Sequence, residues 1–134
     1  MYQHYVQYYE TDKMGVTHHS NYIRFMEEAR VEFFQGIGFD YFEFEKKGMI
    51  SPVVGLNNIK YKRPSTAGDT IDIEVAVKAV TPVVFTLQYI MKIKDNVIFT
   101  GESDHCLLDK NGKIMSLNDK SVKEFTEKLK DLII

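Results

Sequence analysis

The 134-residue chain is 44% hydrophobic and 13% aromatic, which is enough for one domain over residues 1–134 and excludes a disordered protein. Its 17 Lys and Arg nearly balance 19 Asp and Glu, which excludes a nucleic-acid-coating protein and a polybasic membrane binder. One cysteine permits no intrachain disulfide, and with no signal peptide and no apolar run of ~18 residues we expect a cytoplasmic location.

The first half of the chain predicts a strand, a loop and a long helix. Tyr2–Tyr9 is rich in aromatic residues and predicts a strand, whereas residues 10–19 follow no period and predict a loop. A helix is expected from Asn21, ended by Gly36 and Gly38, with apolar positions on one face at Tyr22, Phe25, Met26, Ala29 and Phe33. Further apolar residues widen that face, so we expect the surrounding fold to enclose the helix.

The second half predicts strands joined by short turns, with a helix at the end. After a short amphipathic stretch at Phe39–Lys47, strands are expected at Ile50–Tyr61, Ile71–Lys78, Phe85–Lys94 and Val97–Leu108, and a helix at Asp119–Leu132. Asp95-Asn96 predicts a turn, and Asn111-Gly112 a hairpin turn with positive φ angles. A helix on an antiparallel sheet is an α+β architecture, and we expect a curled antiparallel sheet wrapped around one long central helix.

The loop before the long helix combines features that suit attack on a carbonyl. Asp12 supplies a carboxylate, Gly15 allows a sharp bend, and His18 and His19 supply imidazoles. Unpaired N–H groups of the first helical turn can receive negative oxygen. The carboxylate could therefore attack a carbonyl, or activate water against it, while these amides receive the developing oxyanion. Glu10, two residues before Asp12, could titrate with it or face solvent.

Other interpretations of these residues stay open. An Asp shortly before a Gly is most often ordinary turn chemistry. A metal site made of Asp12, His18 and His19 is disfavoured, because adjacent residues rarely point the same way and no third imidazole is near in sequence. His4 and His105 fall in predicted strands and suit polar or packing roles, and the lone cysteine suits a small buried hydrophobe.

A family signature is recognisable in this loop and helix. From Asp12 it continues with Gly15 three residues on, His19 at seven, Tyr22 at ten and then Glu28-Ala29-Arg30, within YYETDKMGVTHHSNYIRFMEEAR. This stretch closely resembles the signature of the hotdog-fold acyl-CoA thioesterases, in the 4-hydroxybenzoyl-CoA thioesterase and YbgC-like group. Residues 59–75 resemble that family's Tyr-x-x-Pro and Gly-Asp strand pair, and residues 101–113 resemble its last long hairpin. The resemblance implies a hotdog fold.

The resemblance implies hydrolysis of an acyl-CoA thioester to a free acid and CoA, with no cofactor. In such enzymes the aspartate matching Asp12 is the catalytic carboxylate, as nucleophile or general base. The backbone amide at the position of His19 polarises the thioester carbonyl, and the His19 side chain positions substrate or water. Gly15, His18 and Tyr22 are then expected to position the oxyanion and the substrate.

The resemblance also implies partners. The family joins sheets edge to edge with active sites at the subunit boundary, so we expect a homodimer or homotetramer. The turn that carries a basic cluster in the aryl-CoA branch is uncharged here, at Val80–Val83, so Lys60, Lys62 and Arg63 are the candidates for meeting CoA phosphates. These cations also suit a solvated strand edge, and an acyl-carrier protein could take the place of CoA.

Two other classes of function remain as alternatives. A hotdog hydratase or dehydratase needs a His and a carboxylate across a dimer pocket, which His19 and Asp12 could supply, although the Asp-x-x-Gly loop is not that group's pattern. A non-catalytic acyl-thioester-binding module would keep the fold without the chemistry. Assays with thioesters and with an enoyl-CoA separate these alternatives from a thioesterase.

Overall fold

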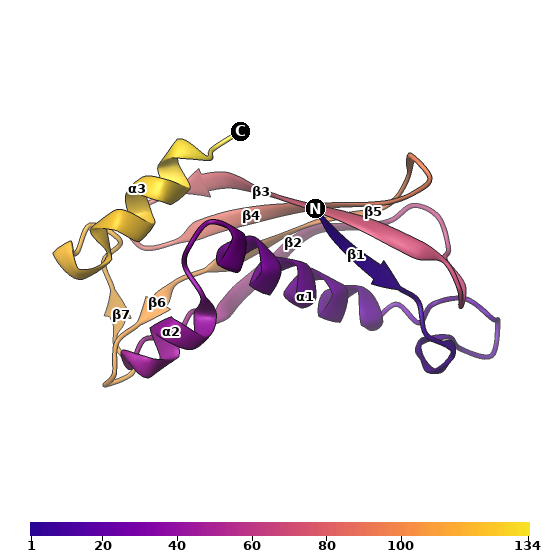
Figure 1. Cartoon of the computed structure of the whole chain (residues 1–134), viewed down its shortest axis with the longest axis horizontal. Coiled ribbons are helices and arrows are strands. Elements are labelled where there is room, and N and C mark those ends of the chain that lie inside the picture. The colour runs from indigo at the N-terminus through magenta and orange to yellow at the C-terminus, as the bar shows by residue number, and fades with distance from the viewer.

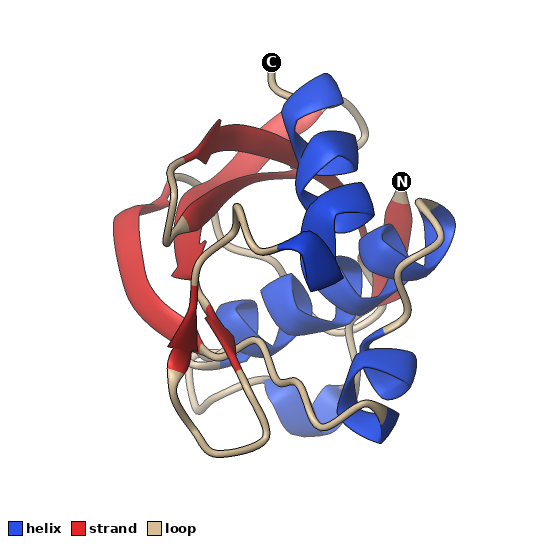
Figure 2. Ribbon diagram, turned by 90° about the vertical axis from the view of Figure 1, so that its left-hand side faces the viewer, coloured by secondary structure: helices blue, strands red, loops and turns tan.

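A computed structural model describes all of residues 1–134 as a curved antiparallel sheet with helices against one face (Figures 1 and 2). The helices are α1 (Asn21–Gly36), α2 (Tyr41–Lys46) and α3 (Lys123–Asp131), with 3₁₀ turns η1 (Tyr8–Glu10) and η2 (Lys120–Val122). The strands are β1 (Tyr2–Tyr5), β2 (Val53–Tyr61), β3 (Thr70–Val80), β4 (Phe85–Ile93), β5 (Asn96–His105), β6 (Leu107–Leu108) and β7 (Ile114–Met115). None of the helices is long and apolar enough to span a membrane.

The main sheet has five strands in the order β1-β3-β4-β5-β2, and all its pairs are antiparallel. Its central strand, β4, buries alternate residues completely: Phe85, Leu87, Tyr89 and Met91. This period of two follows from the opposite directions of successive side chains in a strand. The order leaves β2 as a long edge strand, and its pairing with β5 is irregular next to Gly55.

Helix α1 begins and ends where the sequence predicted. Its apolar face packs on the sheet, with Tyr22, Phe25, Met26 and Ala29 buried, whereas Phe33 is only partly buried and Phe34 is completely buried. The other face carries exposed charged residues, among them Glu27 and Glu32. A single sheet can cover only one side of a helix, so the 16-residue α1 is not enclosed by its own chain, and two shorter helices accompany it.

Several predicted boundaries were wrong because local hydrogen bonds end the strands early. The predicted strand Tyr2–Tyr9 stops at Tyr5, since the Glu10 carboxylate accepts from the Gln7 amide and closes a 3₁₀ turn. The strand predicted at Val97–Leu108 is broken at Cys106 into β5 and β6.

The turns predicted at Asp95-Asn96 and Asn111-Gly112 both form, but their backbone angles differ from those expected. The positive φ angles between β4 and β5 fall at Lys94 and Asp95, one residue before the predicted pair. In the later hairpin only Gly112 has a positive φ, because the Asp109 carboxylate accepts hydrogen bonds from the amides of Asn111 and Lys113 and shapes the turn.

Candidate active site

The loop before α1 is fastened to the segment after β2 by a polar network. The Thr17 amide donates to the Ser65 carbonyl over 2.7 Å, and the two hydroxyls lie 2.6 Å apart. The Tyr22 hydroxyl lies 2.8 Å from the Ser65 hydroxyl, and the Thr66 hydroxyl donates to the Gly15 carbonyl over 2.7 Å. Thr17, Ser65 and Tyr22 are buried, so the loop is held against the sheet at both ends of its bend.

Asp12 is half-buried at the start of this bend. One carboxylate oxygen accepts from the Met14 amide at 2.8 Å, and the Asp12 amide and carbonyl bond to Val16 and Gly15. Gly15 has φ of +79°. A residue with a side chain would pay about 1–2 kcal/mol to adopt this conformation. One Asp12 carboxylate oxygen therefore closes the turn, as the turn interpretation predicted. The second oxygen accepts no hydrogen bond from the protein.

His19 precedes α1 with its backbone amide free. The amides of Ser20, Asn21 and Tyr22 all donate within the turn, to the His18 ring and to the carbonyls of His18 and His19, whereas the His19 amide makes no hydrogen bond. The Tyr61 hydroxyl donates to the His19 carbonyl over 3.1 Å. Burial, and secondarily Tyr22, raises the pKa of Tyr61, which keeps this hydroxyl protonated as a donor.

A cavity of about 290 Å³ lies between the loop, the start of α1 and the end of β2. It brings together three predicted site residues, Asp12, His19 and Tyr22, with two of the predicted cations, Lys62 and Arg63. The remaining lining residues are Val16, Thr17, Tyr61 and Pro64. A carboxylate, a free amide and two cations thus share one open space, which suits a substrate with a polar carbonyl and phosphates.

Comparison with known proteins identifies the family of the chain. A family model described as the thioesterase-like superfamily matches residues 6–131. The chain belongs to this superfamily. An Aquifex aeolicus protein named "Putative esterase" is 39% identical over 132 residues, covering 98% of each chain. "Putative acyl-CoA thioesterase YneP" of Bacillus subtilis is 48% identical over 65 residues, 48% of this chain and 46% of that one.

The solved structures agree with the family. The DHNA-CoA thioesterase of Staphylococcus aureus superposes with a TM-score of 0.90 at 28% identity, covering 97% of this chain and 87% of that one. The sheet with helices on one face is therefore a hotdog thioesterase fold, and the protein is a thioester hydrolase.

Three predicted site residues of this thioesterase lie outside the cavity. Lys60 is exposed on β2. Gly15 forms the bend of the loop through the positive φ of its backbone. The His18 ring packs on the His19 ring, with centroids 4.2 Å apart, and its Nδ1 lies 2.8 Å from the Ser20 hydroxyl. No group of three His, Cys, Asp or Glu side chains comes together as a metal site.

Sequence reasoning missed the aromatic and hydroxyl residues that hold this thioesterase site. Tyr61 and Ser65 flank the Lys-Arg-Pro segment, and no local period marks either as a contact of the loop. Glu10 does not face solvent. It is buried, and its carboxylate lies 2.8 Å from His4 Nε2, while His4 Nδ1 lies 2.9 Å from the Glu28 carboxylate. Glu10 and His4 thereby join β1 to α1 beneath the loop.

Proposed function

We propose that this thioesterase hydrolyses acyl-CoA thioesters at the Asp12 cavity. The observation that supports the proposal is that this cavity is lined by both Asp12 and His19, and the backbone amide of His19 makes no hydrogen bond. As general base, Asp12 takes a proton from water, whose oxygen attacks the thioester carbonyl. The carbonyl oxygen becomes an oxyanion, the C–S bond then breaks, and CoA leaves as a thiolate that takes up a proton. As nucleophile, Asp12 itself attacks the carbonyl carbon and the C–S bond breaks, so that CoA leaves as a thiolate that takes up a proton; water then opens the resulting mixed anhydride, which releases the acid and restores the Asp12 carboxylate.

The His19 amide is the donor for the oxyanion. A donor that is free before substrate arrives needs no rearrangement as charge develops, and one such donor is worth about 10²–10³ in rate. Tyr61 fixes the carbonyl of the same residue and so orients this peptide. The His19 side chain lines the cavity and positions substrate or water.

The carrier of the acyl group meets the cations at the end of β2. Lys62 and Arg63 line the cavity, and guanidinium groups bind phosphate through two parallel hydrogen bonds. Lys60 lies on β2, two residues before Lys62, and can add to the positive electrostatic field. CoA carries several phosphates and an acyl-carrier protein only one, so we assign CoA as the carrier.

The enzyme acts as a dimer through β2, with a tetramer as the larger alternative. This edge strand exposes backbone groups and large apolar side chains: Val53, Val54, Leu56 and Tyr61. Such an edge is a template for pairing, and two copies related by a two-fold axis would pair β2 antiparallel in one continuous sheet. In that dimer α1 becomes the central helix wrapped by the sheet. A cytoplasmic location is part of the same proposal.

The dimer is tested by light scattering. Wild type is expected at twice the chain mass of 15.6 kDa or a higher even multiple. Val54→Lys places a charge on the exposed edge and should shift the mass toward the monomer. Val83→Lys, an exposed valine in the turn between β3 and β4, is the matched control and should leave it unchanged. A monomeric wild type would overturn the dimer.

The function is tested by thiol release from a panel of acyl- and aroyl-CoA thioesters. Asp12→Asn keeps the size of the side chain and should lose about 10²–10⁴ in kcat/KM, the range for removing one acid–base group. Asp109→Asn is the matched control, because Asp109 makes the same turn-capping bonds far from the cavity. Equal activity of Asp12→Asn and wild type would reject Asp12 as the catalytic group.

A further inference from the structure

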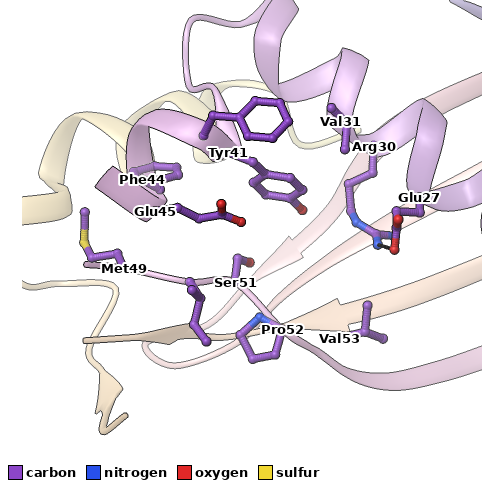
Figure 3. A pocket seen from close by; sticks show the side chains of 12 residues that line it. Glu27, Arg30, Val31, Tyr41, Phe44, Glu45, Met49, Ser51, Pro52 and Val53 are labelled. Carbon is purple, nitrogen blue, oxygen red and sulfur yellow. Dashed lines mark ion pairs between the residues drawn. The ribbon is translucent and has the colours of Figure 1, made fainter. Parts of the chain in front are cut away.

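A second cavity, of about 420 Å³, lies between α1, α2 and the segment leading into β2 (Figure 3). Most of its wall is apolar, with Phe44 and Val53 among the lining residues. Its polar lining residues are Arg30, Tyr41 and Ser51, which belong to three separate segments, together with the exposed Glu27 and Glu45. Apolar walls around a few convergent polar groups are typical of a small-molecule site.

Arg30 is a buried cation without a buried counter-ion. The residue is 6% exposed, and its only hydrogen bond runs from Nη1 to the Tyr89 hydroxyl at 3.1 Å. The carboxylate of Glu27 lies 3.9 Å from Nη2 on a side chain that is 73% exposed (Figure 3). Such a distant and hydrated carboxylate offsets little of the cost of burying a guanidinium.

The network behind Arg30 carries no negative charge. The Tyr89 hydroxyl lies 2.7 Å from the Ser103 hydroxyl, which in turn lies 2.7 Å from His105 Nε2. Burial, and secondarily the charge of Arg30, lowers the pKa of His105 to about 3, so this imidazole is neutral at ordinary pH. The positive charge of Arg30 is therefore left for the cavity side.

Three buried polar atoms at this cavity make no well-aligned hydrogen bond: Arg30 Nε, the Tyr41 hydroxyl and the Ser51 hydroxyl, with Tyr41 close to the other two. Figure 3 shows the Tyr41 hydroxyl pointing toward Arg30, with Ser51 below it. Burial raises the pKa of Tyr41 to about 12, which keeps its hydroxyl a donor. Buried polar groups normally find partners, and a cation with two hydroxyl donors matches a carboxylate, which accepts up to four hydrogen bonds.

The two cavities lie at opposite ends of β2. Val53 lines the Arg30 cavity and Tyr61 lines the Asp12 cavity, eight residues or about 26 Å apart along an extended strand. Within one chain a short acyl group cannot bridge them. If β2 pairs antiparallel with β2 of a second copy in the register centred on Asn57, the middle residue of the strand, Val53 comes beside the partner subunit's Tyr61, one strand spacing of about 5 Å away. A continuous sheet also keeps both α1 helices on the same face.

We propose that the Arg30 cavity of one subunit is the distal acyl subsite of the partner's Asp12 site, where Arg30, Tyr41 and Ser51 bind a carboxylate at the far end of the acyl group. The preferred substrate is then the CoA monothioester of a dicarboxylic acid. This inference rests on the proposed function and on the β2 dimer. Glu27 and Glu45 also line the cavity, and both are exposed, whereas the donor atoms of Arg30, Tyr41 and Ser51 are buried.

The test uses substrate pairs that differ only at the far end, such as adipyl-CoA against hexanoyl-CoA and 4-carboxybenzoyl-CoA against 4-methylbenzoyl-CoA. Wild type should favour the carboxylate member by roughly 10-fold or more in kcat/KM, the scale of a charge-assisted hydrogen bond. Arg30→Met should reduce this preference to about 2-fold or less, on the same reasoning. Arg24→Met, an exposed arginine on the same helix, is the matched control and should keep it.

Two further variants guard against misfolding of Arg30→Met. Tyr41→Phe and Ser51→Ala each remove one hydroxyl, and each should lower the carboxylate preference several-fold while the melting temperature stays near that of wild type. A wild type that cleaves both members equally, or a preference that survives Arg30→Met, would overturn the subsite and leave the thioesterase function intact. A wild type that cleaves no thioester would instead overturn the proposed function, and with it this inference.

Mixed dimers test the assignment to opposite subunits. A heterodimer of Asp12→Asn and Arg30→Met subunits contains one site in which Asp12 meets an intact Arg30 across the interface. This heterodimer should recover about half of the wild-type rate on the carboxylate substrate with the full preference, because one of two sites is complete. If Asp12 and Arg30 acted within one chain, no site would be complete and the preference would stay as low as in the Arg30→Met homodimer.

Discussion

The cavities at the two ends of β2 are built in different ways. The Asp12 cavity takes four of its nine lining residues from one loop, whose turns are closed by backbone hydrogen bonds between residues a few positions apart. The Arg30 cavity depends on side chains that meet from distant segments, and the Arg30–Tyr89 bond joins residues 59 positions apart. At the first cavity Asp12 is half-buried and His19 is exposed, whereas the second cavity has a buried charge, Arg30.

Because of this difference, we expect the two ends of β2 to respond differently to substitutions and to pH. At the Asp12 end the chemistry depends on a few groups that contribute little to folding, so substitutions there should alter rate more than stability. At the Arg30 end protonation is coupled to burial, so acid should lower the stability of the fold through His105.

The largest effect is expected from acid at the Arg30 end. His105 has a folded-state pKa of about 3 against an ordinary 6.5, so the unfolded chain binds the proton more tightly and stability falls as pH drops below 6.5. The loss attributable to His105 should be about 2 kcal/mol at pH 5 and up to about 5 kcal/mol near pH 3. Urea unfolding of wild type and His105→Gln at pH 7 and pH 5 measures it.

The variant should lose less stability than wild type between these two pH values. His18→Gln removes an exposed imidazole and is the matched control, with an expected pH response like that of wild type. Parallel curves for wild type and His105→Gln would mean that His105 is not held neutral, and the contrast between the two ends would fail.

The Asp12 end should show its largest effect in rate. His19→Pro removes the free backbone amide and should lower kcat by about 10²–10³, whereas His19→Ala keeps the amide and should lose much less. Ser20→Pro is the matched control for inserting a proline, because Ser20 already has φ of −63°. Steady-state kinetics with melting curves for all three variants decide the question. Equal losses in His19→Pro and His19→Ala would assign the effect to the imidazole instead.

How far the sequence could predict this molecule follows the same division. Alternation in β3 and β4 and the apolar period of α1 predicted the layers, because these signals are local and repeat over many residues. The Asp12 segment was also predicted to be a loop, since it follows no period over residues 10–19. The strand end at Tyr5 was missed because one hydrogen bond, from the Gln7 amide to the Glu10 carboxylate, closes the turn that follows it.

The Arg30 cavity was not predicted, although one signal was present. Arg30 follows Met26 by four positions, so a charged residue lies on the apolar face of the helix. That pattern indicates a buried charge but does not reveal its partners. Tyr41, Ser51 and Tyr89 join it only through the tertiary fold, and no spacing in the sequence connects them.

A moderate effect on stability is expected at the Asp12 end from Tyr22→Phe. The lost hydroxyl lies 2.8 Å from Ser65, and removing one buried hydrogen bond should cost about 1 kcal/mol. Ser65 keeps its bond to Thr17, so the loop remains fastened. Tyr9→Phe, at an exposed position, is the control and should change stability by less than about 0.5 kcal/mol. A loss above about 3 kcal/mol would show that the Asp12 loop contributes to the stability of the fold as much as the Arg30 end does.

The smallest effect is expected from Arg30→Met, although Arg30 is the most buried charged residue of α1. A guanidinium without a close carboxylate gains little from burial, and an unbranched apolar side chain of similar length can fill its place, so stability should stay the same or rise by up to about 2 kcal/mol. Arg24→Met, on the exposed face, should remain within about 0.5 kcal/mol of wild type. Chemical denaturation without ligand measures both. A loss above about 2 kcal/mol would mean that Tyr89 and Glu27 already compensate the charge within the fold, and a carboxylate ligand would then have little left to gain.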